Sequence, residues 1–406
     1  MKSLMSRGIA VILMVMVMAQ TVYGVEKSVT PKDNDTGMYN IAGADSDIPA
    51  LLAESAIVVD MKTGYTLIEK NIHQKLYPAS ITKIMTAILT LEQAAMNEVV
   101  TFSYDAVHSI EVGSSAAYVD VDEQLSVEQC LYGLMLISGN DLANGLAEHV
   151  GGSMESFAAM MTEKAKGLGC ETTNFTNAHG LHDENHYTTA YDMALISKYA
   201  YDNLEMFRTL CSTGYYECQP TNKQEEIRYW RNNNKLINEY QEEYYEDCIG
   251  GKTGFTNQAG GTLVSFANVN GRVLMCVIMK STHSLAAYAD TTNLYEYVRN
   301  NVTAEMYADL DKKYEESKEV ETEPATTVKP SEDNGDVTGT EKLSTESVEP
   351  VVSNDADEEE SDGIWIGWFI ILAVIVIFGI YYAYLQYVRY KIRKRRREER
   401  MRRRNS

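Results

Sequence analysis

The stretch GTLVSFANVNGRVLMCVIM, residues 261–279, contains two β-prone runs, 261–267 and 273–279. Between them, Asn270-Gly271 is a strong signal for a tight hairpin turn. A second pair of β-prone runs, 56–59 and 65–68, flanks Lys62-Thr63-Gly64 near the other end of the folded region. The sequence therefore predicts a strand hairpin at each end.

Helices are predicted between and after these hairpins. Pro78 opens a strongly apolar segment, and Ser126 with Gln129 forms a capping box ahead of another. Ser153 is the predicted cap of a third. The predicted helical ranges are 80–94, 131–137, 141–150, 153–166, 189–201 and a last one at 284–297. This order predicts an α+β fold, with an antiparallel sheet built from both chain ends, flanking helices and an all-helical lobe.

The charge balance of the 406-residue chain argues against nucleic acid as a partner. There are 58 Asp and Glu against 36 Lys and Arg, a formal charge of -22, and eleven of the basic residues fall between Arg389 and Arg404. The rest of the chain, without this basic cluster, is thus more acidic than the whole chain, and it would repel the phosphate backbone of a nucleic acid. Apolar residues make up 45% and charged residues 23%, which excludes a chain disordered throughout.

Both ends of the chain carry predicted membrane-related segments. Residues 1–24 are typical of a secretory signal peptide, with Lys2 and Arg7 before a short apolar core; an uncleaved anchor is the alternative. Residues 364–385 hold 22 residues without a charge, which as a helix rise about 33 Å and match the bilayer core. The basic tail, 386–406, is expected to stay cytoplasmic, so most of the chain is predicted to lie outside the cytoplasm.

Composition separates a folded region, 47–301, from a tether, 313–363. The tether is rich in Glu, Asp, Ser, Thr and Pro without a periodic apolar pattern, which predicts a disordered acidic stalk. The six cysteines include no C-x-x-C pair. Cys211 and Cys218 are the nearest pair, but spacing alone does not decide whether they are bridged.

Ser80 and Lys83 belong to the hexapeptide PASITK, residues 78–83. Three residues apart on a helix, they project from one face. The first helical turn favours negative charge developing on Ser80, and burial of Lys83 would lower its pKa and make it a usable base. The alternative is a serine cap followed by an exposed lysine, because S-x-x-K is a common pattern.

Ser138-Gly139-Asn140 interrupts two predicted helical segments, so its side chains can project from a turn. The hydroxyl of Ser138 can relay a proton, and the amide of Asn140 can hold a substrate carbonyl or the lysine. The alternative is an ordinary helix–turn–helix, in which Gly and Asn only mark the turn between the two helices.

Lys252-Thr253-Gly254 lies within GGKTGFTNQAG, residues 250–260. A strand-borne Lys and Thr can bind a substrate carboxylate, and the glycines let a substrate backbone approach closely. The tripeptide alone is a weak signal, because Lys62-Thr63-Gly64 repeats it in a predicted hairpin turn.

The order S-x-x-K, S-x-N, K-T-G, with gaps of 58 and 114 residues, is far more specific. With it, the chain resembles the serine-type D-alanyl-D-alanine carboxypeptidases, which are low-molecular-mass penicillin-binding proteins of the β-lactamase-like superfamily. HGL at 179–181, YTTA at 187–190 and DMA at 192–194 also fit that family. The resemblance covers 47–301 and implies a β-lactamase/transpeptidase-like fold, a peptidoglycan stem peptide ending in D-Ala-D-Ala as substrate, and a place at the bacterial cytoplasmic membrane.

The resemblance also implies catalytic roles. Ser80 attacks the carbonyl of the penultimate D-alanine and becomes the acyl-enzyme, while Lys83 accepts its proton. Ser138 relays a proton toward the leaving D-alanine, and Asn140 orients the site. The backbone N–H groups of Ser80 and Phe255 are expected to hold the oxyanion.

Substrate binding is assigned by the same resemblance to Lys252, Thr253, Gly254 and Phe255, with Lys252 and Thr253 on the terminal carboxylate. Many relatives have His at the position of Phe255, a departure that bears on substrate preference. β-Lactams are implied as inhibitors, and no cofactor or metal is implied. The β-rich second domain of many relatives is expected to be absent, because the acidic stalk begins almost at once.

Three alternatives remain. His179, His182 and His186 could gather a zinc ion, although no carboxylate–His signature follows them. A class A-like β-lactamase would share the acylation of Ser80, but no E-x-x-L-N-type loop supplies a deacylating glutamate. A non-catalytic cell-wall-binding ectodomain would suit the stalk and tail, but the intact motif triplet favours an enzyme.

Overall fold

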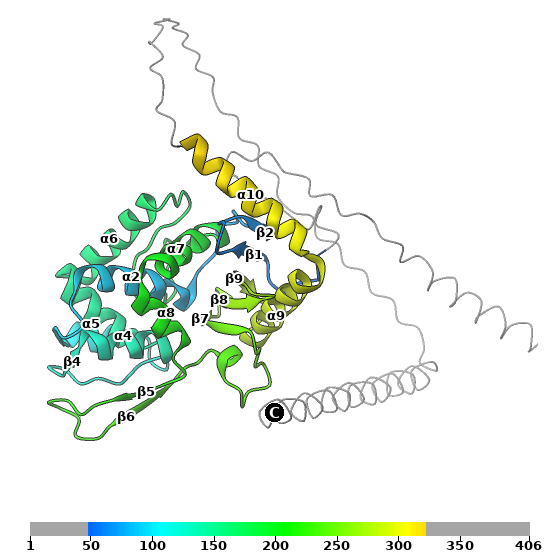
Figure 1. The fold of residues 1–406 in the computed structure, drawn as a ribbon. Helices are drawn as coiled ribbons and strands as arrows, with labels where there is room; N and C mark the ends of the chain where they lie inside the picture. The colour runs from blue at the N-terminus through cyan, green and yellow to red at the C-terminus, as the bar shows by residue number, and fades with distance from the viewer. Residues whose placement is uncertain (1–47, 322–406) are drawn as a thin grey trace, which may run out of the picture. The chain divides into compact units, whose positions relative to one another are not determined.

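Strands from both ends of the described chain meet in one five-stranded antiparallel sheet, in the order β2-β1-β9-β8-β7. The computed structural model describes residues 48–321, which belong to one compact unit. The strands of the sheet are β1 (Ser55–Asp60), β2 (Thr66–Lys70), β7 (Cys248–Thr256), β8 (Gly260–Val269) and β9 (Arg272–Ser281). The predicted α+β class and both predicted hairpins are confirmed (Figure 1).

The turn between β8 and β9 follows from its two residues. Asn270 and Gly271 both have positive φ, 54° and 80°, as a two-residue hairpin turn requires. Behind this turn, alternate side chains of β9 enter two separate apolar cores: Met275 and Val277 face one, Leu274 and Cys276 the other. Because β9 is covered on both faces, an unbroken apolar run is stable there.

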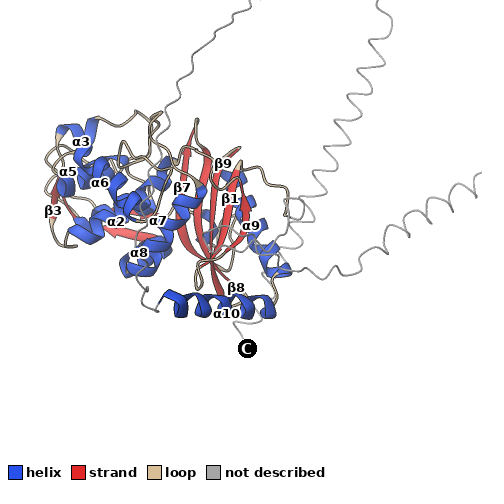
Figure 2. Ribbon diagram, turned by 90° about the horizontal axis from the view of Figure 1, so that it is seen from above, coloured by secondary structure: helices blue, strands red, loops and turns tan. Residues whose placement is uncertain are grey.

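Helices cover the two faces of the sheet unequally, and both views show the larger group on one side and α9 on the other (Figures 1 and 2). The larger group forms the helical lobe and packs on the core that contains Met275. Its helices are α2 (Lys83–Gln93), α3 (Tyr104–His108), α4 (Val127–Leu136), α5 (Asn140–Gly151), α6 (Met154–Gly167), α7 (Ala190–Asn203) and α8 (Glu205–Ser212). The other core lies under α9 (Ser284–Asn301) and α10 (Ala304–Glu321).

Several predicted helix starts are confirmed by their caps. The Ser126–Gln129 capping box is present at α4, and the Ser153 and Thr189 side chains accept hydrogen bonds at the starts of α6 and α7. One start differs. Ser80 does not lie in an α-helix but in the 3₁₀ turn η1 (Ala79–Thr82), and α2 begins only at Lys83.

The helix predicted to be last, 284–297, is followed by a further one, α10. Leu310 of α10 is buried in the second core, and Asp311 forms ion pairs with Arg272 and Lys62. These anchors hold α10 on the sheet, and the helix continues to residue 321. The stretch 313–321, for which the sequence predicts the start of a disordered stalk, is therefore helical.

The remaining stalk, 322–363, lies outside the described residues, as do the predicted signal peptide 1–24, membrane segment 364–385 and tail 386–406. Within residues 48–321, no helix has both the length and the apolar character needed to cross a bilayer. All six cysteines, Cys211 and Cys218 included, are free thiols.

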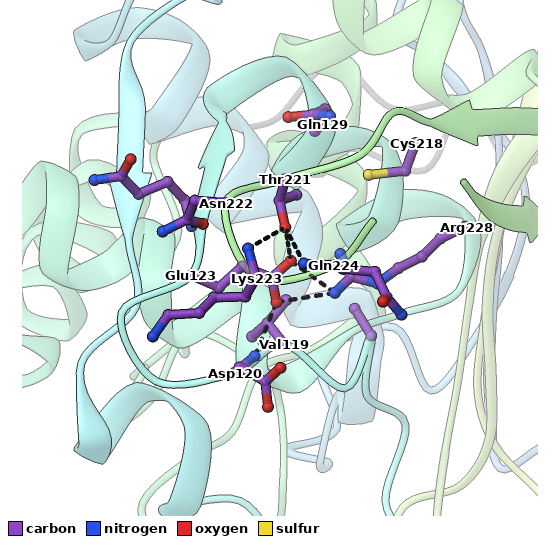
Figure 3. A network of polar contacts seen from close by, with 12 residues as sticks. Val119, Asp120, Glu123, Gln129, Cys218, Thr221, Asn222, Lys223, Gln224 and Arg228 are labelled. Carbon is purple, nitrogen blue, oxygen red and sulfur yellow. Dashed lines mark hydrogen bonds and ion pairs between the residues drawn. The ribbon is translucent and has the colours of Figure 1, made fainter. Parts of the chain in front are cut away.

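Two small two-stranded sheets border the helical lobe. One pairs β3 (Val99–Thr101) with β4 (Gln124–Ser126), and the other pairs β5 (Tyr215–Cys218) with β6 (Arg228–Arg231). Figure 3 shows how they are joined: Glu123 receives hydrogen bonds from Arg228, at 2.7 and 2.8 Å, and from Thr221, at 2.6 Å. Glu123 is fully buried, so this ion pair fixes the β5–β6 hairpin against the segment before β4.

Candidate active site

Ser80 stands on a strained turn. Pro78 precedes η1, and Ala79 has φ +49°, a left-handed conformation that is unfavourable for a residue with a side chain. Packing holds it there: a Cβ added to Gly180 would lie 1.9 Å from the carbonyl oxygen of Ala79, so only glycine fits against this turn. Strain of this kind persists where surrounding structure enforces it, and it is common at functional sites.

Lys83, the first residue of α2, is fully buried, and its Nζ contacts three oxygens. It donates to Asn140 Oδ1 at 2.7 Å and to the His179 carbonyl at 2.6 Å, and it lies 3.1 Å from Ser80 Oγ. The amide and the carbonyl oxygens can only accept, so they take two N–H groups. In the neutral amine, the lone pair is then left for the Ser80 hydroxyl proton.

Electrostatics favour that neutral form. Burial, and next the positive charge of Lys252, hold the pKa of Lys83 well below its usual value, although Asp141 opposes the shift. A lysine with a lowered pKa is a competent general base near neutral pH. The geometry and the charge at Lys83 therefore both suit removal of the Ser80 proton.

The S-x-N motif occupies the turn between α4 and α5. Ser138 has φ +63°, and Asn140 is the first residue of α5. Besides accepting from Lys83, Asn140 donates from Nδ2 to Ser114 Oγ at 3.0 Å and from its backbone N to the Ser115 carbonyl at 2.8 Å. Asn140 thus joins the lysine to the 114–115 segment.

Lys252 reaches the same turn from β7, the edge strand of the sheet. Its Nζ donates to Ser138 Oγ at 3.0 Å and to the Thr253 carbonyl at 2.8 Å, and the residue is 1% exposed. Burial lowers the pKa of Lys252 to about 7, with the neighbouring Cys211 opposing. Close packing of β7 on η1 needs Gly254, because a Cβ there would lie 2.8 Å from the Ser80 backbone nitrogen.

One cavity of about 670 Å³ collects most of the predicted site. Ser80, Ser138, Asn140, Thr253, Gly254 and Phe255 all line it. Lys83 and Lys252 lie behind its wall, each bonded to one of the lining serines. A smaller cavity of about 320 Å³, lined by residues including Tyr201 and Arg208, contains none of the motif residues.

Lys252 differs in its surroundings from the other three predicted substrate-binding residues. Its side chain is buried and does not line the cavity, and its direct contact with a substrate carboxylate stays a prediction. Its donors are directed to Ser138 and to the Thr253 carbonyl. Lys62-Thr63-Gly64, by contrast, forms the expected turn between β1 and β2, away from the cavity.

The three histidines considered for zinc have separate surroundings. His186 is bonded to Thr82 Oγ1 at 2.8 Å and accepts from the Thr176 backbone at 3.0 Å. His179 Nδ1 accepts from Leu181, and the His182 ring packs edge-on against Tyr77. Burial lowers the pKa of His186 to about 3 and that of His179 as well. Within residues 48–321 no three potential ligands are grouped around a metal position.

Sequence reasoning missed several parts of the site. The His179 carbonyl that holds Lys83 is a backbone group, which no side-chain pattern reveals. Ser114, Lys235, Ser284 and Tyr288 line the cavity but belong to no motif. Only the tertiary fold brings these segments together.

Comparison with known proteins agrees with this geometry. Residues 42–283 match the model of the peptidase S11 family, described as D-alanyl-D-alanine carboxypeptidase. The chain is 32% identical over 253 residues to D-alanyl-D-alanine carboxypeptidase DacF of Bacillus subtilis, an alignment that covers 60% of this chain and 61% of that protein. It is 31% identical to the D-alanyl-D-alanine carboxypeptidase of Streptomyces sp. strain K15, covering 61% of this chain and 88% of the relative.

Solved structures show the same likeness. The crystal structure of the Streptomyces K15 DD-transpeptidase aligns with a TM-score of 0.57 and 30% identity, over 62% of this chain and 98% of that one. A D-alanyl-D-alanine carboxypeptidase from Mycobacterium tuberculosis aligns with a TM-score of 0.57 and 27% identity, over 63% and 94%. With the family model matching more than half of its residues, the chain belongs to the D-alanyl-D-alanine carboxypeptidase family, peptidase S11.

Proposed function

We propose that this protein is a serine D-Ala-D-Ala carboxypeptidase that removes the terminal D-alanine from peptidoglycan stem peptides. The observation that carries the proposal is the pair of lysine–serine contacts, Lys83 Nζ to Ser80 Oγ at 3.1 Å and Lys252 Nζ to Ser138 Oγ at 3.0 Å. One pair supplies an activated nucleophile, and the other supplies a route for returning a proton.

In the first half-reaction, Ser80 Oγ bonds to the carbonyl carbon of the penultimate D-alanine while its proton passes to Lys83. The oxyanion is held by the backbone N–H groups of Ser80 and Phe255. Thr253 and Phe255 are two residues apart on the edge strand β7. Their backbone N–H and C=O groups therefore point to the same side of that strand. The Thr253 carbonyl accepts a hydrogen bond from Lys252 and not from a neighbouring strand. This supports an N–H of Phe255 that points away from the sheet and is free to bind the oxyanion.

Collapse of the tetrahedral intermediate breaks the peptide bond and releases D-alanine. The leaving amine needs a proton, and Ser138 passes one to it while drawing another from the Lys252 ammonium. Asn140 keeps Lys83 oriented throughout, since it is bonded to the Lys83 amine and to Ser114. Proton exchange with solvent then returns Lys83 to its neutral form and Lys252 to its ammonium form. Water next attacks the ester carbonyl carbon, neutral Lys83 takes the water proton and passes it to Ser80 Oγ, and the ester bond breaks to release the shortened peptide.

Thr253 and Gly254 line the cavity beside Ser80, so we assign them to the terminal D-alanine. Lys252 contributes positive charge from behind the wall. Phe255 is 50% exposed, which suits contact with the part of the stem peptide that leaves the cavity. β-Lactams, as acylating agents of Ser80, are the expected inhibitors.

We further propose that the enzyme works outside the cytoplasmic membrane, held by the segment 364–385. The predicted signal peptide, membrane segment and basic tail support this arrangement, and a cell-wall substrate agrees with it. Labelling intact and permeabilised cells with a membrane-impermeant fluorescent penicillin tests it. Labelling only after permeabilisation would contradict it.

The test of the activity is incubation of the exported chain with an acyl-D-Ala-D-Ala peptide, followed by assay of free D-alanine and mass mapping of a penicillin adduct. We expect release of D-alanine and a long-lived adduct on Ser80, both lost in Ser80→Ala. Undiminished release in that variant would end the proposed mechanism. Rapid turnover of penicillin would favour a β-lactamase, but none of the described residues that line the cavity has a carboxylate. Absence of both reactions would favour a non-catalytic wall-binding protein.

A further inference from the structure

Among residues 48–321, one charged side chain lines the cavity, and it belongs to no motif. That residue is Lys235, in the 3₁₀ turn η2 (Lys235–Ile237) between β6 and β7. Thr253 of β7 and Ser284 of α9 line the same cavity. An anionic substrate entering the cavity would therefore meet Lys235 as the charged group of the lining that the structure describes.

The backbone of Lys235 is fixed by α9. Its N–H donates to Tyr288 Oη at 3.4 Å, and Tyr288 Oη donates to the Asn233 carbonyl at 3.0 Å. Asn233 and Tyr288 also line the cavity. The backbone of the turn is thus attached to α9 at the cavity wall, which fixes the point from which the Lys235 side chain extends.

The ammonium of Lys235 is not saturated by the protein. Among the described residues it has one charged partner, Glu243 Oε2, at 3.5 Å, which is long for a charge-assisted hydrogen bond. Its side chain is 38% exposed. Since a lysine ammonium has three donors, donors remain for a ligand.

Lys252 has the opposite properties. It is 1% exposed, its Nζ is bonded to Ser138 and Thr253, and it does not line the cavity. Its pKa near 7 also leaves it partly uncharged at neutral pH. A permanent negative charge on a substrate needs a partner that is charged and accessible.

We propose that Lys235 binds the terminal carboxylate of the substrate, beside the hydroxyl of Thr253, while Lys252 serves the proton transfer through Ser138. This inference rests on the proposed carboxypeptidase function. It makes η2 a specificity-determining element: the enzyme selects a free C-terminus by an ion pair formed outside the three motifs.

The test compares two substrates in two variants. A diacyl-L-lysyl-D-alanyl-D-alanine peptide and its C-terminal carboxamide differ only in the charge that Lys235 would bind. We expect Lys235→Met to lower kcat/KM on the order of tenfold for the acid, mainly through KM, and to leave the carboxamide unchanged. Lys166→Met, at an exposed lysine of α6, should change neither rate.

A second pair of compounds makes the same comparison without relying on turnover of the carboxamide, which is expected to be slow. Acylation of Ser80 by a penicillin and by its methyl ester differs in the same charge, and Lys235→Met should slow only the free acid. Equal losses for both members of each pair, or no loss, would overturn the inference and leave the carboxypeptidase proposal intact. Failure of the unaltered protein to react with any of the four compounds would overturn the proposed function itself.

A double variant at Lys235 and Glu243 distinguishes a purely structural role of Lys235 from substrate binding. Glu243 Oε2 is buried and accepts no hydrogen bond from the described residues, so Lys235 could matter only as its counter-charge. In that case Lys235→Met/Glu243→Gln should recover the rate lost in Lys235→Met. If Lys235 binds the carboxylate, the double variant keeps the selective loss for the acid substrate.

Discussion

Lys252 Nζ and Ser138 Oγ lie 3.0 Å apart, although 114 residues separate them in the sequence. Lys252 comes from the edge strand of the sheet and Ser138 from the turn between α4 and α5 of the helical lobe. Their hydrogen bond spans the two halves of the molecule at the wall of the cavity. The relative position of sheet and lobe therefore sets the geometry of this lysine–serine contact.

Replacing Lys83 by Met should reduce the rate of Ser80 acylation by about 10³-fold, because the base is lost. Lys83→Arg keeps the charge but has no accessible neutral form, so it should be similarly slow. Stopped-flow labelling with a fluorescent penicillin measures the rate, and circular dichroism confirms folding. A folded Lys83→Arg variant that acylates at the normal rate would rule out Lys83 as the base.

The acylation rate should also rise with pH and level off well below the usual lysine pKa. Burial and the nearby charge of Lys252 lower the pKa of Lys83, so its neutral form appears at lower pH than in an exposed lysine. The two amines interact, so the apparent pKa values belong to the pair. Second-order acylation rates across the pH range measure this. A rate still rising steeply at the pKa of free lysine would contradict it.

The stability contribution of Lys252 should depend on pH with a defined sign. Its pKa is lowered to about 7 in the folded protein, whereas the unfolded chain keeps the usual value near 10.4. Between these values the unfolded state binds one more proton, so the folded state gains stability as pH rises. Relative to Lys252→Met, the free energy of unfolding should increase by about 1.4 kcal/mol per pH unit across this window. Urea unfolding at several pH values tests it, and a constant difference between the two proteins would refute it.

Gly254→Ala should impair acylation strongly. The added Cβ would lie 2.4 Å from Thr262 Oγ1 and 2.8 Å from the Ser80 backbone nitrogen, so β7 or η1 must shift. A displacement of about 1 Å at a reacting group can cost on the order of 10²-fold in rate. Gly214→Ala is the matched control, because nothing lies within 4 Å of its added Cβ. Equal acylation rates for the two variants would show that the close approach is not needed.

Glu123→Ala should lower the free energy of unfolding by about 3 kcal/mol, because it leaves Arg228 largely buried without its counter-charge. Asp202→Ala removes an exposed partner of Lys198 and should change little. Urea denaturation compares the two. A small loss in Glu123→Ala would mean that water or Thr221 replaces the carboxylate.

Predictions from the sequence held where the responsible interactions are local. The 270–271 turn, the Ser126–Gln129 capping box and the Ser153 cap each involve residues at most a few positions apart. Such contacts form whatever the rest of the chain does. The α10 helix was missed for the opposite reason, since its anchors, Leu310 and Asp311, act on distant strands.

The sequence by itself determined the three motifs and their spacing. It also determined the alternation of strands and helices that places these motifs on one fold. It did not determine which lysine lines the cavity. Burial depends on every segment packed around a side chain, so Lys252 is enclosed by the helical lobe while Lys235, in an unremarkable turn, lines the cavity. The 3₁₀ turn at Ser80 and the His179 carbonyl on Lys83 likewise arise only when segments about a hundred residues apart come into contact.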